Sequence, residues 1–163
     1  ERYIQLMDRE LKMVLANESQ TLLLGKKLAS MLCGGEFIAF FGDLGAGKTT
    51  LVRGIAAELG IDSIASPTFN IVRHHENGRL TLDHFDCYRL SDYEELLAIG
   101  FDDYLSSGSV IVMEWCENVE EALPPERLEI HISGSGNDVR EVRIIPFGAE
   151  YAKFTEGSRL ELK

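Results

Sequence analysis

The sequence predicts a three-layer α/β fold, in which helices cover a mixed, largely parallel β-sheet that also carries antiparallel hairpins. Three observations lead to this fold class. Residues 36–41 form a short apolar run that precedes a glycine-rich loop and an amphipathic helix. Residues 109–115, SVIVMEW, are almost continuously apolar, as is typical of a strand buried on both faces of a parallel sheet. Alternating apolar and polar residues around Asn77-Gly78, and again around SGSGND, predict two hairpins.

The other elements follow from periodicity and from turn residues. Residues 12–16 predict an edge strand, and residues 18–33 predict a helix. The apolar stripe of that helix consists of Leu22, Leu28, Ala29 and Leu32. The helix after the glycine-rich loop ends at Gly60, and a shorter helix further along the chain ends at Gly100. The predicted hairpin strands are residues 69–73, 80–86, 127–133 and 139–146.

The chain is interpreted as a single domain over residues 1–163, because no internal repeat or low-complexity linker divides it. A chain of this length buries roughly 70% of the surface that its unfolded form exposes, which is enough for one core. Residues 1–11 are expected to form a loose N-terminal extension, and residues 148–163 a C-terminal helix or tail.

Residues 41–54, FGDLGAGKTTLVRG, contain a phosphate-binding loop. Gly42, Gly47, Lys48 and Thr49 satisfy the pattern G-x-x-x-x-G-K-[ST]. In this loop backbone N–H groups surround the α- and β-phosphates, the lysine reaches the β- and γ-phosphates, and the hydroxyl ligates magnesium. The following helix directs its N-terminus at the phosphates, where unpaired N–H groups and the macrodipole favour anions. The sequence therefore predicts a phosphate-loop NTPase-like domain.

Two acidic residues are candidates for handling magnesium and the attacking water. Glu114 follows four apolar residues at the end of a predicted strand, and Asp86 ends the first hairpin within HFDCYR. Glu114 can reach the metal through a water or orient the nucleophile, and a solvent-facing glutamate is the alternative. Asp86 can act beside it, or Asp86 and His84 can pair with each other or with Arg89 at the sheet edge.

Two further polar segments are less specific. Thr68, in the stretch SPT, lies between a helix and a hairpin, where it can contact a γ-phosphate and couple nucleotide state to loop shape. An ordinary turn is the alternative for this stretch, because serine and proline favour turns. His74 and His75 lie beside a hairpin turn, and we expect them to be solvated rather than to bind a metal.

The composition indicates which partners the domain can bind directly. The formal net charge is −11 and the pI is about 4.8. Proteins that bind nucleic acids derive much of their affinity from Lys and Arg contacts with phosphates, which this charge opposes. We therefore expect no tight, direct binding of RNA or DNA by the chain alone. In a nucleic-acid pathway, a partner protein would hold the nucleic acid.

Cysteine usage and hydropathy indicate the compartment. Cys33, Cys87 and Cys116 are odd in number and widely spaced, which argues against both a disulfide framework and a zinc site. We expect three thiols that are buried or without a functional role, in a reducing cytoplasm. No run approaches the length of a membrane span, and the segment ERYIQLMDRELK is too charged for a secretory signal.

Taken together, the motifs resemble those of the TsaE family of bacterial phosphate-loop ATPases. GDLGAGKTT, SPTF, HFDCYRL with SDYEEL behind it, and VMEW match this family in order and spacing, over about residues 14–145. The family is required for threonylcarbamoyladenosine formation in tRNA. The resemblance implies a cytoplasmic ATPase that uses ATP and Mg²⁺ and supports a complex of the TsaD and TsaB proteins, which transfers the threonylcarbamoyl group.

The resemblance also implies roles for individual residues. Thr49 and Glu114 would bind magnesium, and Lys48, Asp86 and Glu114 would serve hydrolysis. Trp115 would pack near the nucleotide, and Thr68 would lie in a switch-like loop. The nucleotide-binding residues would be Glu18, Asp43, Leu44, Gly45, Ala46, Gly47, Lys48, Thr49, Thr50, Thr68, Trp115 and Arg140. Of these, Glu18 and Arg140 match the family pattern only approximately.

Two other functions use the same loop. A small-molecule or nucleotide kinase commonly closes an arginine-bearing lid over the phosphates, and no short arginine cluster occurs in this sequence. A guanine-nucleotide switch would need a guanine-selective element such as N-K-x-D, which the sequence lacks. Because no arginine is obviously placed to stabilise transition-state charge, we expect slow ATP hydrolysis by the isolated chain.

Overall fold

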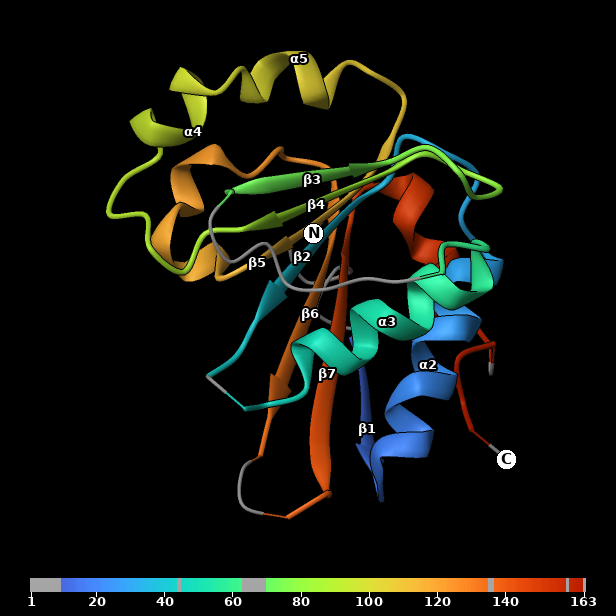
Figure 1. The fold of residues 1–163 in the computed structure, drawn as a ribbon. Helices are drawn as coiled ribbons and strands as arrows, with labels where there is room; N and C mark the ends of the chain where they lie inside the picture. The colour runs from blue at the N-terminus through green and yellow to red at the C-terminus, as the bar shows by residue number, and fades with distance from the viewer. Residues whose placement is uncertain (1–9, 44, 63–69, 135–136, 158, 163) are drawn as a thin grey trace.

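The computed structural model describes residues 10–43, 45–62, 70–134, 137–157 and 159–162. Within these ranges the chain forms one seven-stranded sheet with helices on both faces (Figure 1). The strands are β1 (Leu11–Leu15), β2 (Phe37–Phe41), β3 (Val72–His75), β4 (Leu82–Asp86), β5 (Val110–Glu114), β6 (Arg127–Ser133) and β7 (Arg140–Phe147). The helices are α2 (Glu18–Ser30), α3 (Lys48–Glu58), α4 (Glu94–Ala98) and α5 (Phe101–Leu105). Short 3₁₀ helices are η1 (Cys116–Asn118), η2 (Glu120–Ala122) and η3 (Ala149–Phe154).

The sheet is parallel in its centre and antiparallel at both edges. Its strand order is β1-β7-β6-β2-β5-β4-β3. Strands β6, β2, β5 and β4 pair in parallel, whereas β1 with β7, β7 with β6, and β4 with β3 pair antiparallel. The predicted fold class, including both hairpins, is confirmed.

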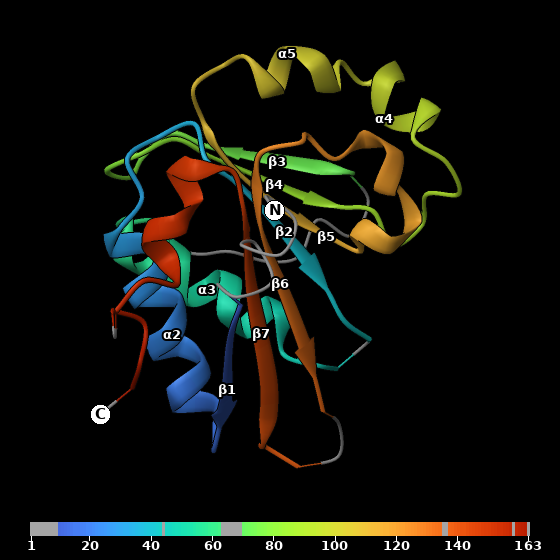
Figure 2. The ribbon, with the colours of Figure 1, turned by 180° about the vertical axis from the view of Figure 1, so that it is seen from behind.

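Alternating side chains of the central strands enter two separate cores. Ile38 and Val112 pack on one face against α2 and α3, which lie together on that side of the sheet (Figures 1 and 2). Phe85 and Met113 pack on the other face, with residues of α4, α5 and η1. Every residue of β5 is buried, which explains why its sequence is almost continuously apolar.

The hairpin of β3 and β4 is present, with its strands shifted along the chain from the predicted bounds. The last paired residues are His75 and Leu82, so the connection is residues 76–81 and contains Asn77-Gly78. Gly78 is needed for a further reason, because a Cβ at this position would lie 2.4 Å from the carbonyl oxygen of Leu59. The connection therefore packs against the end of α3. Phe69, the predicted start of this hairpin, lies outside the described residues.

Helix α2 ends at Ser30 rather than at residue 33. Both ends of the described chain pack onto the domain. At the N-terminal end, β1 begins at Leu11 and pairs with β7 at the sheet edge. In η3, Tyr151 and Phe154 are buried, and Tyr151 Oη accepts a hydrogen bond of 2.8 Å from the Phe37 N–H. None of the helices in the described ranges combines the length and apolar character that a membrane span requires.

Helices α2 and α3 approach each other closely through two glycines. A Cβ at Gly25 would lie 2.4 Å from the carbonyl oxygen of Leu51, and a Cβ at Gly54 would lie 2.3 Å from that of Leu22. Real Cβ atoms do not approach backbone so closely, so the interhelical distance depends on both glycines. This contact fixes α3, whose first residue is Lys48 of the phosphate loop.

We predict that Gly54→Ala destabilises the protein by about 1–3 kcal/mol, because overpacking forces the two helices apart. In an uncrowded helix the same change would stabilise by up to about 1 kcal/mol through helix propensity, so the sign of the effect is diagnostic. Urea unfolding of the variant measures it, with Ser30→Ala at an exposed position of α2 as the control. A stabilised Gly54→Ala protein would contradict the packing described.

All three cysteines are free, with Cys33 exposed and Cys87 and Cys116 buried. Burial raises the pKa of the Cys87 thiol to about 12 and that of Cys116 well above its usual range. Because the thiolate is the reactive form, we predict that only Cys33 reacts with a thiol reagent at pH 8 in the native protein. All three should react in urea, and Cys33→Ser should abolish the native signal. Rapid native labelling of Cys87 would contradict this.

Candidate functional site

The phosphate loop connects the carboxyl end of β2 to the start of α3 (Figure 1). Gly47 caps α3 with a φ of 104°, a left-handed conformation that suits glycine. As a glycine, it contributes no side-chain cap hydrogen bond to the helix. At Gly42, a Cβ would lie 2.3 Å from the carbonyl oxygen of Ile132. These features fit an anion-binding loop, whose residue Leu44 lies outside the described ranges.

The Lys48 side chain is held inside the loop. It is 5% exposed, and its ammonium group donates a hydrogen bond to the carbonyl oxygen of Gly42. The same Nζ lies 3.7 Å from the centroid of the Trp115 ring, a cation–π contact. Burial lowers the pKa of Lys48, while the carboxylates of Glu117 and Glu114 act in the opposite direction. The carbonyl oxygen of Gly42 and the Trp115 ring thus hold the ammonium group at the loop, where a phosphate oxygen could take the place of the carbonyl.

Asp86 and Glu114 lie side by side at the carboxyl ends of two parallel strands. They are partners in the register of β4 and β5. Glu114 is 3% exposed, and its Oε2 lies 2.5 Å from Nε2 of His84, which excludes a solvent-facing glutamate. Asp86 Oδ1 accepts a hydrogen bond of 3.0 Å from the Tyr88 N–H. Burial, with a further contribution from Glu114, raises the pKa of Asp86. His84 therefore pairs with Glu114 rather than with Asp86.

Trp115 has an unusual backbone conformation. With a φ of 60°, it is the only non-glycine residue with a positive φ in the described part of the chain. Its ring lies between Lys48 and Tyr88, with ring centroids 4.9 Å apart in the Trp115–Tyr88 pair. Such conformations cost free energy and concentrate at functional sites. The strand end turns sharply here and places the indole over the loop.

Arg140, at the start of β7, contacts the phosphate loop directly. Its Nε donates to the carbonyl oxygen of Ala46 at 2.8 Å, and its Nη2 to that of Gly45 at 3.1 Å. Glu18 lies further away, at the start of α2, and pairs with Arg53 at 3.2 Å. Arg53 also donates to the Thr50 hydroxyl, so this arginine links Glu18 to the first turn of α3.

A cavity of about 390 Å³ brings most of the predicted residues together. Its lining consists of Gly45, Ala46, Gly47, Lys48, Thr49, Thr50, Asp86, Tyr88, Glu114, Trp115 and Arg140. Glu18 and Asp43 are exposed and do not line it, and Thr68 lies outside the described residues. Sequence reasoning missed Tyr88, although it belongs to the same HFDCYR segment as Asp86.

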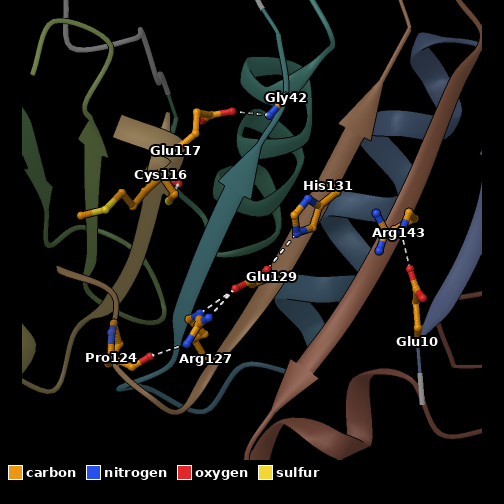
Figure 3. A network of polar contacts seen from close by, with 10 residues as sticks. Glu10, Gly42, Cys116, Glu117, Pro124, Arg127, Glu129, His131 and Arg143 are labelled. Atoms are coloured by element: carbon orange, nitrogen blue, oxygen red, sulfur yellow. Dashed lines mark hydrogen bonds and ion pairs between the residues drawn. The ribbon is translucent and has the colours of Figure 1, made fainter. Parts of the chain in front are cut away.

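A larger cavity, of about 810 Å³, lies along β1, β7 and β6 and includes Gly42 and Glu117. Figure 3 shows the polar contacts on this side of the sheet, including the 3.3 Å hydrogen bond from the Gly42 N–H to Glu117. Glu129 is buried there, yet its pairs with His131 and Arg127 lower its pKa overall. These charges satisfy one another, and Asp86 and Glu114 do not line this cavity, so we assign the chemistry to the smaller one.

The residues of the smaller cavity fit a magnesium–nucleotide complex. Magnesium commonly binds through one or two protein oxygens together with phosphate oxygens and water. No cluster of three or more His, Cys, Asp or Glu able to hold a metal ion occurs within the described ranges. Thr49 and Glu114 both line the cavity, beside the loop that would hold the phosphates.

The fold and the loop define a phosphate-loop α/β protein. The family model described as "Threonylcarbamoyl adenosine biosynthesis protein TsaE" matches residues 15–142. The chain belongs to the TsaE family.

Individual relatives agree over most of the chain. The "tRNA threonylcarbamoyladenosine biosynthesis protein TsaE" of Bacillus subtilis is 40% identical over 149 residues, which are 91% of this chain and 93% of that protein. The protein of the same name from Rickettsia felis is 34% identical, over 85% of this chain and 81% of that protein. The crystal structure of YdiB from Bacillus subtilis superimposes with a TM-score of 0.78 at 36% identity, over 90% of this chain and 92% of that one.

Proposed function

We propose that this chain is a magnesium-dependent ATPase that supports threonylcarbamoyladenosine modification of tRNA by acting on a complex of TsaD and TsaB proteins. One observation carries the ATPase proposal: Lys48, Asp86 and Glu114 converge on a single cavity at the phosphate loop. The names of its relatives in the TsaE family support the tRNA-modification role.

In the proposed binding step, phosphate oxygens replace the internal partners of Lys48. The loop amides and the N-terminus of α3 would bind the α- and β-phosphates. The Lys48 ammonium would leave the carbonyl oxygen of Gly42 and bind the β- and γ-phosphates, since a charged acceptor gives the stronger hydrogen bond. Trp115 remains beside the site, so its fluorescence would report nucleotide binding.

In the proposed hydrolysis step, the two acids have different tasks. Thr49 and Glu114 would hold Mg²⁺, which neutralises charge on the β- and γ-phosphates when bound. Asp86 would orient the water that attacks the γ-phosphorus. The bond from that phosphorus to the bridging oxygen breaks, ADP leaves with the electron pair, and the proton of the water passes to phosphate.

Slow turnover by the isolated chain remains our expectation. Arg140 lines the cavity, but its guanidinium group is bound by carbonyl oxygens of the phosphate loop and of its own hairpin, including those of Gly45, Ala46 and Val139. An arginine that stabilises the transition state must instead contact the phosphoryl oxygens, and its contribution can reach about 10³–10⁵ in rate. Partner proteins would therefore be needed to rearrange the site or to supply such a group.

The nucleotide site is tested by three variants. We predict that Lys48→Ala loses most ATP binding, because a buried positive charge beside the phosphates is removed. Asp86→Asn should keep nucleotide binding while lowering hydrolysis about 10²- to 10⁴-fold, and Glu114→Gln should weaken the response to magnesium. Calorimetry and single-turnover hydrolysis measure these effects, and Lys12→Ala and Glu141→Gln at exposed positions serve as charge-matched controls. Wild-type hydrolysis in both acid variants would overturn the assignment.

The proposed partners are tested with purified TsaD and TsaB proteins. A chain with a net charge of −11 should leave tRNA binding to its partners, in the cytoplasm where tRNA is modified. We predict that the chain alone turns over ATP more slowly than the roughly 10 s⁻¹ of a median enzyme. It should co-elute with the TsaD–TsaB complex in the presence of ATP and hydrolyse ATP faster in its presence. Unchanged turnover without co-elution would contradict the partner proposal.

A further inference from the structure

His84 is a buried polar side chain in β4, between Arg73 of β3 and Val112 of β5 in the strand register. On β4 it lies on the same face as Leu82 and Asp86, and this face of the sheet is the one that α3 covers. It is 0% exposed, and its partner in the register of β5 is Val112. Placing an imidazole at this position costs desolvation free energy, which requires a compensating interaction.

That interaction is the hydrogen bond to Glu114. Nε2 of His84 lies 2.5 Å from Oε2 of Glu114, two residues further along β5 than its register partner. Nδ1 of the same ring is buried without a hydrogen-bond partner among the described residues. Glu114 is therefore the polar side chain that holds this ring in the described structure. A carboxylate that binds a metal only accepts hydrogen bonds, so Nε2 would be the donor of this contact when Glu114 binds magnesium.

The contact has a consequence for the carboxylate. Glu114 is 3% exposed and lines the cavity at the phosphate loop. With Oε2 bound to His84, the second oxygen of the carboxylate is the one left to face the cavity. The backbone reinforces this arrangement, because the Cys87 N–H donates to the carbonyl oxygen of Glu114 at 3.1 Å and ties the ends of β4 and β5 together.

We propose that His84 is a positioning residue that fixes Glu114, so that a single carboxylate oxygen is presented to the magnesium–nucleotide complex. The inference rests on the proposed function. Groups that hydrogen-bond a metal-binding side chain orient it, and their loss typically lowers metal affinity or activity about 10- to 100-fold. The sequence left two roles open for Glu114, contact with the metal through a water and orientation of the nucleophile. The contact with His84 favours the first, in which Glu114 binds the metal or its bound water.

The experiment measures Mn²⁺ affinity in the presence of a non-hydrolysable ATP analogue, by electron paramagnetic resonance and by the fluorescence of Trp115, the single tryptophan. His84→Leu removes the donor at similar size, whereas the side-chain amide of His84→Gln can still donate to Glu114. We expect His84→Leu to weaken Mn²⁺ binding about 10- to 100-fold and His84→Gln to recover most of that loss. Binding of the analogue without metal should be unchanged in both variants.

Two controls separate positioning from a general effect on the fold. In a Glu114→Ala background, His84→Leu should cause no further loss of Mn²⁺ affinity, because the group it positions is gone. His131 forms a similar pair with Glu129, at 2.8 Å and away from the cavity, so His131→Leu should leave Mn²⁺ binding unchanged.

The outcomes distinguish the two proposals. Unchanged Mn²⁺ affinity in His84→Leu, failure of His84→Gln to rescue, or additive effects with Glu114→Ala would overturn the positioning role while leaving the proposed function intact. A wild-type protein that binds neither the analogue nor Mn²⁺ would overturn both.

Discussion

Parallel pairing of β2, β5 and β4 is the constraint on which the rest of this structure depends. Parallel strands end at the same edge of a sheet, so the phosphate loop after β2 and the acids that end β4 and β5 meet there. The hydrogen-bonded register sets Asp86 directly opposite Glu114. Two carboxylates and a lysine from distant parts of the sequence are thereby placed together by the backbone alone.

The local patterns of the sequence account for most of the fold. The glycine-lysine loop, the apolar run of β5 and the alternation in the hairpins each report on neighbouring residues, and all predicted elements that lie in the described ranges are present near their predicted positions. Asn77-Gly78 correctly predicted the hairpin, but Gly78 also serves a second constraint that the sequence does not reveal. A glycine that permits a tight turn cannot be told, from sequence, from one that permits close approach to Leu59.

The site was less completely predictable, for a related reason. Motif spacing identified Lys48, Asp86 and Glu114, because each belongs to a short segment with a recognisable chemistry. Tyr88 was missed, and the His84–Glu114 contact was one that the sequence could not specify, since it depends on the relative register of two strands. Glu18 is linked to Thr50 through Arg53, a contact that the sequence does not specify, and its role in nucleotide binding stays a prediction.

Arg140 links the phosphate loop to the connection between β6 and β7 by hydrogen bonds. The same guanidinium group that binds Gly45 and Ala46 also binds the carbonyl oxygens of Asn137 and Val139, in the connection between β6 and β7. One side chain thus joins the phosphate loop to the β6–β7 connection, and separating the two segments would break these hydrogen bonds. A protein that displaced the β6–β7 connection would also break the hydrogen bonds of Arg140 to Gly45 and Ala46, and so alter the loop without entering the cavity.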